Sequence, residues 1–465
     1  MNTRNWFERL IDGVADRGLE LIGLRDSTDD RTPSDTELCH RLLDGLGEAS
    51  NIALAREILQ RWESMDEARR LSFLQVLAVE FDPDPEEISK AAAAYQAKDP
   101  TSLQHLLAVS EPPRQELMRR LNMAPGGTES LVDIRAFLLR NLKQHPELKG
   151  VDDDFLHLLA SWFNRGFLRL EQIDWNSPAA LLEKLIQYEA VHPMSGWDDL
   201  RRRLASDRRC FAFFHPALPQ DPLIFVEVAL VREVSDTIRP LIDPDAPEGD
   251  PKQADTAVFY SINNALRGLR GVSFGNFLIK QVVSELSSEF PDIRTFVTLS
   301  PIPRMRQGLL KAFEEPKHRD AILALLDDQV DRLTEATGTD NPLAALDKLL
   351  QQSETPQTEI VKSLLIDLAL YYLGVMKRGE GAYDPVAHFH LSNGARLERI
   401  NLHANPSSRG LNESWGCMVN YRYQGDEVVA NHEAYVCDGQ IVLSRDLERR
   451  LQQLTNRLRK ETVNA

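Results

Sequence analysis

Ser300 is the first residue whose type and setting could support chemistry. It lies in TLSPIP (298–303), where two prolines restrict the backbone and end a strand. The hydroxyl of Ser300 is therefore expected at a strand terminus, where it can face a pocket. A serine before proline is also a common turn residue, so the segment alone leaves both interpretations open.

Histidine occurs twice in HFHLSNG (388–394), at His388 and His390. On a strand, residues two apart share a face, so this pair could bind a metal together with His403, as in cupin-like barrels. However, the nearest downstream carboxylate, Glu398, is eight residues after His390. Two alternatives are a lone histidine acting as a proton donor and a hydrogen-bonded histidine near a sheet edge.

A glycine-rich turn, GLRGVSFG (268–275), precedes the amphipathic segment NFLIKQVVSELSSEF (276–290). A strand–glycine–helix arrangement aims backbone N–H groups and the helix dipole at a phosphate. The spacing matches neither the P-loop nor the dinucleotide fingerprint, which argues against ATP and NAD. It resembles the pyrophosphate loop of the N-acetyltransferase-like (GNAT) fold, although an ordinary strand–helix turn is the alternative.

The overall charge limits the partners of the chain. The 465 residues include 54 basic and 71 acidic side chains, a net charge of −17, which argues against nucleic acid and anionic membranes. A polyanion such as coenzyme A would then need a local basic site. Such a site could use the arginines at 201–203, 208 and 209, although a solvated helix face would explain the same run.

The cellular setting is expected to be the cytoplasm. The four cysteines are scattered without a C-x-x-C pair, which suits a reducing compartment and argues against a zinc ribbon. No apolar run is long enough for a membrane span. The first residues lack the apolar stretch of a signal peptide, and Glu8, Asp12 and Asp16 are unlike a transit peptide.

These residues must be positioned by two different kinds of structure. Residues 1–190 contain apolar side chains at helical spacing, as in IALAREILQ (52–60), and a capping box at 34–37. They predict a helical bundle that serves packing or assembly. From about residue 191 the pattern becomes α+β, and a mostly antiparallel mixed sheet is expected because several strand-like segments follow one another.

The elements expected in the second half follow from the same patterns. Helices are expected at 276–290, 318–337, 356–377 and 444–460. Strands are expected at 209–215, 222–231, 257–262, 293–303, 387–391, 396–404, 415–423 and 433–443.

Several segments, in their order and spacing, resemble malonyl-CoA decarboxylases. They are YEAVHPMSGWDDLRRRL, RRCFAFFHPALP, GLRGVSFGNFLIKQVVSELSSEFP, FVTLSPIP, YDPVAHFHLSNGARLERIN and MVNYRY. The resemblance implies a helical oligomerisation domain at 1–190, a GNAT-like acyl-CoA catalytic domain at 191–465, and a homodimer or homotetramer.

The same resemblance implies conversion of malonyl-CoA to acetyl-CoA and CO₂ without a metal or another cofactor, with coenzyme A entering as part of the substrate. It places the family's catalytic residues at Ser300, His390 and Tyr423. It places the acyl-CoA loop at Arg270, Gly271, Val272, Ser273, Phe274, Gly275 and Asn276.

Two positions depart from the family pattern. Ser273 stands where family members have a glutamate close to the catalytic pair, so that carboxylate cannot be essential here in the same form. His388 stands where other members have asparagine, which makes the H-x-H pair a misleading metal signal.

The chemistry fits these residue types. Loss of CO₂ from a malonyl thioester leaves negative charge on C2, and the thioester itself is the electron sink. The site must hold the carboxylate away from water, stabilise the oxyanion and deliver a proton to C2. We expect Ser300 to engage the carboxylate and His390 to protonate C2.

Three rival functions remain at this point: a GNAT-type acyltransferase acting on an amine, a helical assembly protein with a non-catalytic domain, and a cupin-like metal protein. These functions are separated by incubating the protein with malonyl-CoA and no acceptor, in one sample with EDTA and in another without it. We expect CO₂ and acetyl-CoA at equal rates in both samples, because the thioester accepts the electrons. CO₂ release that stops with EDTA would contradict the metal-free mechanism, and no release would favour the transferase or the assembly protein.

Overall fold

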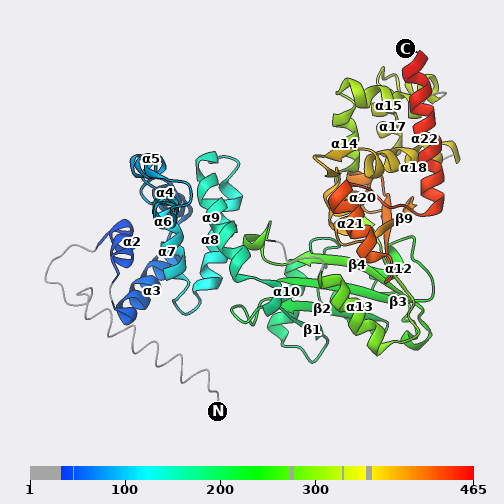
Figure 1. Cartoon of the computed structure of the whole chain (residues 1–465). Helices are drawn as coiled ribbons and strands as arrows, with labels where there is room; N and C mark the ends of the chain where they lie inside the picture. Colours follow the sequence, from blue (N-terminus) through cyan, green and yellow to red (C-terminus); the bar gives the residue numbers. More distant parts are fainter. Residues whose placement is uncertain (1–32, 46, 273–276, 327–328, 352–358, 465) are drawn as a thin grey trace. The chain divides into compact units, whose positions relative to one another are not determined.

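The computed structural model describes residues 33–45, 47–272, 277–326, 329–351 and 359–464 (Figure 1). The chain divides into two compact units. The first contains the residues up to Arg169 together with 214–223 and 264–274, and the second contains the rest. The division into domains at residue 190 stays a prediction, because these units interleave along the chain.

The first unit is helical, as predicted. Its helices are α2 (Asp35–Leu43), α3 (Glu48–Ser64), α4 (Glu67–Val79), α5 (Pro85–Ala94), α6 (Pro100–Ser110), α7 (Pro113–Leu121), α8 (Gly127–Asn141), α9 (Lys149–Trp162) and the 3₁₀ turns η1 (Pro146–Leu148), η2 (Arg165–Phe167) and η4 (Arg267–Leu269). The predicted capping box is confirmed: Glu37 N donates to Ser34 Oγ at 3.1 Å and Ser34 N donates to Glu37 Oε2 at 2.6 Å.

The second unit is built on a mixed sheet of eight strands within the described residues. The strands are β1 (Arg169–Ile173), β2 (Arg208–Phe214), β3 (Ile224–Val231), β4 (Thr256–Asn264), β5 (Thr295–Thr298), β6 (Ser300–Pro301), β9 (Arg396–Asn401) and β10 (Met418–Tyr423). Their order is β1-β2-β3-β4-β5-β10-β6, and β9 pairs with β10. A separate hairpin joins β7 (Lys377–Arg378) and β8 (Gly381–Ala382).

Pairing within this sheet confirms the predicted α+β class. Strand β10 is antiparallel to β5, β6 and β9, and β2 is antiparallel to β3, whereas β4 and β5 are parallel. The mostly antiparallel character is therefore confirmed for the pairings whose register is described.

Helices complete the second unit. They are α10 (Ala179–Tyr188), α11 (Trp197–Arg203), α12 (Arg239–Ile242), η3 (Pro251–Gln253), α13 (Phe277–Glu289), α14 (Met305–Ala312), α15 (Pro316–Leu326), α16 (Val330–Thr337), α17 (Pro342–Gln351), α18 (Glu359–Gly374), α19 (Pro385–Ser392), α20 (Ser408–Ser414), α21 (Val428–Asp438) and α22 (Arg445–Asn464). Figure 1 shows α22, in red, beside α15 and α18, on which it packs.

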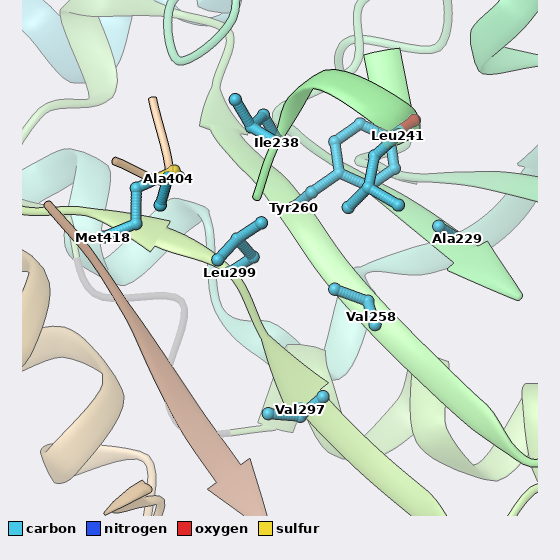
Figure 2. Packing of buried hydrophobic residues seen from close by; sticks show 9 residues of the cluster. All are labelled: Ala229, Ile238, Leu241, Val258, Tyr260, Val297, Leu299, Ala404 and Met418. Carbon is cyan, nitrogen blue, oxygen red and sulfur yellow. The ribbon is translucent and has the colours of Figure 1, made fainter. Parts of the chain in front are cut away.

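A hydrophobic core lies on one face of the sheet (Figure 2). Val297 and Leu299 point into it with Val258, Tyr260 and Met418, and each of these side chains is buried. Successive side chains of an extended strand point to opposite faces. The packing of Val297 and Leu299 therefore directs Thr298 and Ser300 to the opposite face.

The predicted strand AHFHL (387–391) is wrong, because these residues belong to helix α19. Asp384 caps this helix by accepting hydrogen bonds from Val386 N and Ala387 N, both at 2.9 Å, and Pro385 occupies the first turn. This local capping outweighs the alternating polar pattern that suggested a strand.

The predicted strand EAYVCDGQIVL (433–443) is also wrong. Its first half is the end of α21, which closes at Gly439 with φ +62°. The predicted helix at 318–337 is interrupted, since α15 ends at Leu326 and α16 begins at Val330.

Among the helices that the structure describes, none combines the length and apolar character of a membrane span.

Gly394 tests the turn that ends α19. Its φ is +82°, and a Cβ there would collide with the carbonyl oxygen and side chain of Val428. Gly379 has φ +62° but no neighbour that a Cβ would touch. We expect Gly379→Ala to cost about 1 kcal/mol of unfolding free energy, from backbone strain alone, and Gly394→Ala to cost clearly more. Thermal unfolding of both variants measures the difference, and equal shifts would contradict the collision.

Candidate active site

Ser300 lies on the face of the sheet opposite the hydrophobic core. It is 6% exposed, and its Oγ is 2.9 Å from Thr298 Oγ1, to which it donates. Thr298 Oγ1 also accepts a hydrogen bond from Tyr421 N at 3.1 Å. The prediction that Ser300 stands at a strand terminus is confirmed, because β6 ends at Pro301.

His390 faces Ser300 from helix α19. The imidazole is 3% exposed, with Nε2 3.0 Å from Ser300 Oγ and Nδ1 2.8 Å from the hydroxyl of Tyr423 on β10. The structure thus brings together Ser300, His390 and Tyr423, the three residues that the sequence grouped.

Aromatic rings fix the orientation of the imidazole. The ring of Tyr421 stacks on His390 with centroids 4.6 Å apart and planes 24° apart. Phe389 meets the same imidazole edge to face at 5.1 Å. With both nitrogens bonded and one face covered, the ring has little freedom to rotate.

Beneath these residues, the buried Asn420 joins three strands. Its Nδ2 donates to Thr298 O at 2.7 Å, and its Oδ1 accepts from Asn401 Nδ2 at 2.7 Å. Arg399 Nε donates to the same Oδ1 at 3.1 Å. The amide therefore holds β5, which leads directly to Ser300, in register with β9 and β10.

The hydrogen-bond partners of His390 are compatible with either of its neutral tautomers. If Tyr423 donates to Nδ1, then Nε2 carries the proton and donates to Ser300 Oγ, and Ser300 donates onward to Thr298. In the opposite arrangement Ser300 would donate to His390, and its proton would be unavailable to Thr298. Thr298 would then donate to Ser300, and His390 Nδ1 would donate to Tyr423, so both arrangements satisfy all three contacts and the first one places the proton on Nε2.

Burial keeps the hydrogen-bonded side chains of His390 and Tyr423 uncharged. Desolvation lowers the pKa of His390 to about 3 and raises the pKa of Tyr423 well above its ordinary value. At neutral pH His390 is therefore an uncharged imidazole and Tyr423 an uncharged phenol.

Asp384, which caps α19, is a buried carboxyl close to this group. Desolvation raises its pKa to about 6, although the donors Val386 N and Ala387 N act in the opposite direction. Tyr372 donates to its second oxygen at 3.4 Å. Asp384 thus fixes the start of the helix that carries His390.

His388 does not share a face with His390. On a helix, residues two apart point in widely different directions, and His388 Nδ1 lies 2.7 Å from the hydroxyl of Tyr435. The premise of the H-x-H metal pair is therefore wrong, because it required a strand.

The expected acyl-CoA loop is described only in part. Arg270, Gly271 and Val272 belong to the first unit, whereas Ser273, Phe274, Gly275 and Asn276 lie outside the described residues. Gly271 has φ +86°, and no Cβ would fit at Gly268 against Val132 of α8. Glycine is thus required at both positions.

Helix α8 holds the start of this loop through Arg135, which is 2% exposed. Its Nη1 donates to Gly268 O at 2.7 Å and to Arg270 O at 2.9 Å, while its Nε pairs with Asp152 at 3.0 Å. No sequence pattern predicts this clamp, because Arg135 lies more than a hundred residues before the carbonyls that it binds.

The arginine run at 201–209 is not a free anion site. Its members are engaged as follows: Arg202 with Asp207, Arg203 with Glu227, Arg208 with Asp207, Arg209 with Glu289, and Arg201 over the ring of Trp175. The solvated-face alternative is also wrong for Arg202 and Arg203, which are buried.

Thr298, Tyr421 and Asp384 were missed by sequence reasoning as parts of the site. Alternation along TLS would have placed Thr298 on the face of Ser300, and the Asp384-Pro385 pair is a helix-start signal. The stacking of Tyr421 depends on the pairing of β10 and could not be read from the sequence.

Two family models match the chain. The malonyl-CoA decarboxylase C-terminal domain matches residues 166–461, and the malonyl-CoA decarboxylase N-terminal domain matches residues 81–163.

Similar proteins carry the same name. The mitochondrial malonyl-CoA decarboxylase of Anser anser anser is 37% identical over 392 residues, which are 79% of this chain and 77% of that protein. The Rattus norvegicus enzyme of the same name is 36% identical over 77% of this chain and 74% of its own length.

Solved structures agree. The malonyl-CoA decarboxylase of Rhodopseudomonas palustris superposes with a TM-score of 0.81 at 45% identity, over 90% of this chain and all of the other. That of Agrobacterium vitis gives 0.76 at 43% identity, over 89% of this chain and 98% of the other.

Burial of His390 predicts a pH-dependent stability. Between pH 3 and 6.5 the unfolded chain binds a proton on this residue and the folded chain does not, so unfolding free energy rises with pH in that window. One such group contributes about 1.4 kcal/mol per pH unit. We expect His390→Asn to reduce the slope by about one proton, measured by urea unfolding at several pH values. The buried His192, whose pKa is also lowered to about 3, keeps its own contribution. An unchanged slope would contradict the neutral buried imidazole.

Proposed function

The chain belongs to the malonyl-CoA decarboxylase family, and from this premise we propose how its buried serine and histidine convert malonyl-CoA to acetyl-CoA and CO₂. The observation that carries the proposal is the hydrogen-bonded pair of Ser300 and His390, two buried side chains with Nε2 and Oγ 3.0 Å apart.

Ser300 is proposed to hold the malonyl carboxylate. Without substrate its hydroxyl donates to Thr298, a neutral acceptor. A carboxylate is a stronger acceptor, so the hydroxyl can turn to it while still accepting from His390. Holding the carboxylate out of the plane of the thioester aligns the breaking bond with the carbonyl that accepts the electrons.

His390 is proposed to protonate C2. As CO₂ leaves, the electron pair of the C2–carboxylate bond passes into the thioester, and C2 then takes the proton from Nε2. The tautomer with its proton on Nε2 places this proton beside Ser300, where the malonyl group is held. The buried setting excludes water that would compete for the same contacts.

Cofactor independence is part of the proposal, because the thioester supplies the electron sink that a metal or another cofactor would otherwise supply. A covalent acyl-serine is not needed, since no acyl group is transferred. The alternative of an acyltransferase acting on an amine is not favoured, because relatives over most of the chain are decarboxylases by name.

The homo-oligomer and the cellular location are proposals as well. Helix α6 in the first unit has no buried residue and exposes Leu103 and Leu107 one turn apart. This apolar pair supports assembly of a dimer or tetramer through the helical part. A cytoplasmic location is the proposal, although the curated relatives are named as mitochondrial.

Substitution of the two site residues tests the proposal. We expect His390→Asn and Ser300→Ala each to lower acetyl-CoA release by ~100- to 10,000-fold, the usual cost of removing a positioned acid–base group. His388→Asn is a matched control on the same helix, because its imidazole contacts Tyr435 instead, and it should keep nearly full activity. Near-normal turnover of either site variant would refute that residue's role.

A further inference from the structure

Decarboxylation consumes a proton in each turnover. A carboxylate leaves as neutral CO₂, and C2 gains a hydrogen that comes ultimately from solvent. If His390 delivers this hydrogen, as proposed above, the buried imidazole must be resupplied before the next turnover. Solvent has little access to the ring, which is 3% exposed.

On the side of the imidazole away from Ser300, the contacts of His390 leave one route for a proton. Among the described residues, the hydrogen-bond partner of Nδ1 is the hydroxyl of Tyr423, at 2.8 Å. Two other described neighbours, Tyr421 and Phe389, meet the imidazole through their aromatic rings. Tyr423 is thus the group through which a proton can reach Nδ1.

Tyr423 also lines a pocket of about 560 Å³. The walls are apolar and come from α13, the start of β5 and the start of α21: Ile279, Val283, Phe296 and Val428. The rim includes the exposed Lys280, Arg294 and Gly425, and Val429, which is 58% exposed. Because exposed residues line it, the pocket opens to solvent, and its volume holds several water molecules at about 30 Å³ each.

We propose that Tyr423 is a proton relay, which passes a proton from water in this pocket to Nδ1 of His390 as Nε2 gives its proton to C2. Tyr423 acts through His390 and touches no substrate atom in this scheme.

The transfers balance as follows. The C2–carboxylate bond breaks and its electron pair moves toward C2. The Nε2–H bond breaks as the C2–H bond forms, and the O–H bond of Tyr423 breaks as the Nδ1–H bond forms. A water molecule in the pocket reprotonates the phenol oxygen, and bulk solvent neutralises the hydroxide left behind. His390 then carries a single proton, on Nδ1. The starting tautomer returns when Nδ1 gives this proton back through Tyr423 to the pocket water while Nε2 takes a proton from Ser300. Solvent that enters as acetyl-CoA leaves reprotonates Ser300.

Because His390 and Tyr423 are both uncharged, a concerted transfer of their protons is favoured. Burial disfavours both an imidazolium at His390 and a phenolate at Tyr423, as the directions of their pKa shifts indicate. Moving the protons together avoids both charged states, whereas a stepwise transfer would form one of them.

The test measures turnover in mixtures of H₂O and D₂O. We expect a curved dependence on the deuterium fraction for the wild-type chain, since several protons move together. Tyr423→Phe should lower kcat about 100-fold, the low end for a lost acid–base group, and should give a linear dependence. Tyr421 stacks its ring on the same imidazole, and its buried hydroxyl has no hydrogen-bond partner among the residues that the structure describes. Tyr421→Phe should therefore keep the curved dependence, whatever its turnover.

A second pair of variants leaves Tyr423 in place. Val429 and Val436 are both 58% exposed on α21, but Val429 lines the pocket and Val436 does not. Val429→Trp should narrow the opening and lower kcat, whereas Val436→Trp should leave turnover unchanged.

The outcomes separate this inference from the proposed function. A curved dependence retained in Tyr423→Phe, with His390→Asn inactive, would overturn the relay and leave His390 as the proton donor. Full turnover in His390→Asn would overturn the proposed function itself. A linear dependence in Tyr423→Phe together with slow Val429→Trp supports the relay, and fast Val429→Trp excludes this pocket as its source of water.

Discussion

An imidazole without access to water must find partners for both of its nitrogens inside the protein, and the part of the sheet unit around His390 is organised around this constraint. Ser300 meets one nitrogen of His390 and Tyr423 meets the other. These partners come from two paired segments of the sheet, while the histidine comes from a helix that Asp384 starts at a fixed residue. A shift in any of these elements would leave a buried polar atom without a partner, which costs more than a normal hydrogen bond contributes.

The segment 297–300, which runs from the end of β5 to the start of β6, contributes both to the hydrophobic core and to the candidate active site. Val297 and Leu299 pack into the hydrophobic core, so alternation sends Thr298 and Ser300 to the other face. The position of the serine therefore depends on apolar residues that never contact it. Asn420 adds a polar restraint, since its buried amide ties this segment to β9 through Asn401. Core packing and the amide of Asn420 together position the hydroxyl of Ser300.

Local patterns predicted much of this arrangement and failed where distant contacts decide. The capping box at Ser34, the strand end at Ser300 and the helix after the glycine loop follow from neighbouring residues. The alternation of AHFHL predicts a strand, whereas Asp384 and Pro385 just before it start helix α19. The stacking of Tyr421 on His390 depends on long-range pairing, and no local pattern carries that information.

Arg135 gives the helical part a role beyond packing. Its guanidinium satisfies the carbonyl oxygens of Gly268 and Arg270, while Asp152 on α9 neutralises its charge. Residues 265–272 accordingly fold with the helices, although they lie in sequence between strand β4 and helix α13. Residues 191–465 therefore do not include all of the side chains that hold this stretch. A chain shortened to residues 191–465 would lose the guanidinium that binds these carbonyls, so the start of the glycine-rich turn depends on a side chain of the helical part.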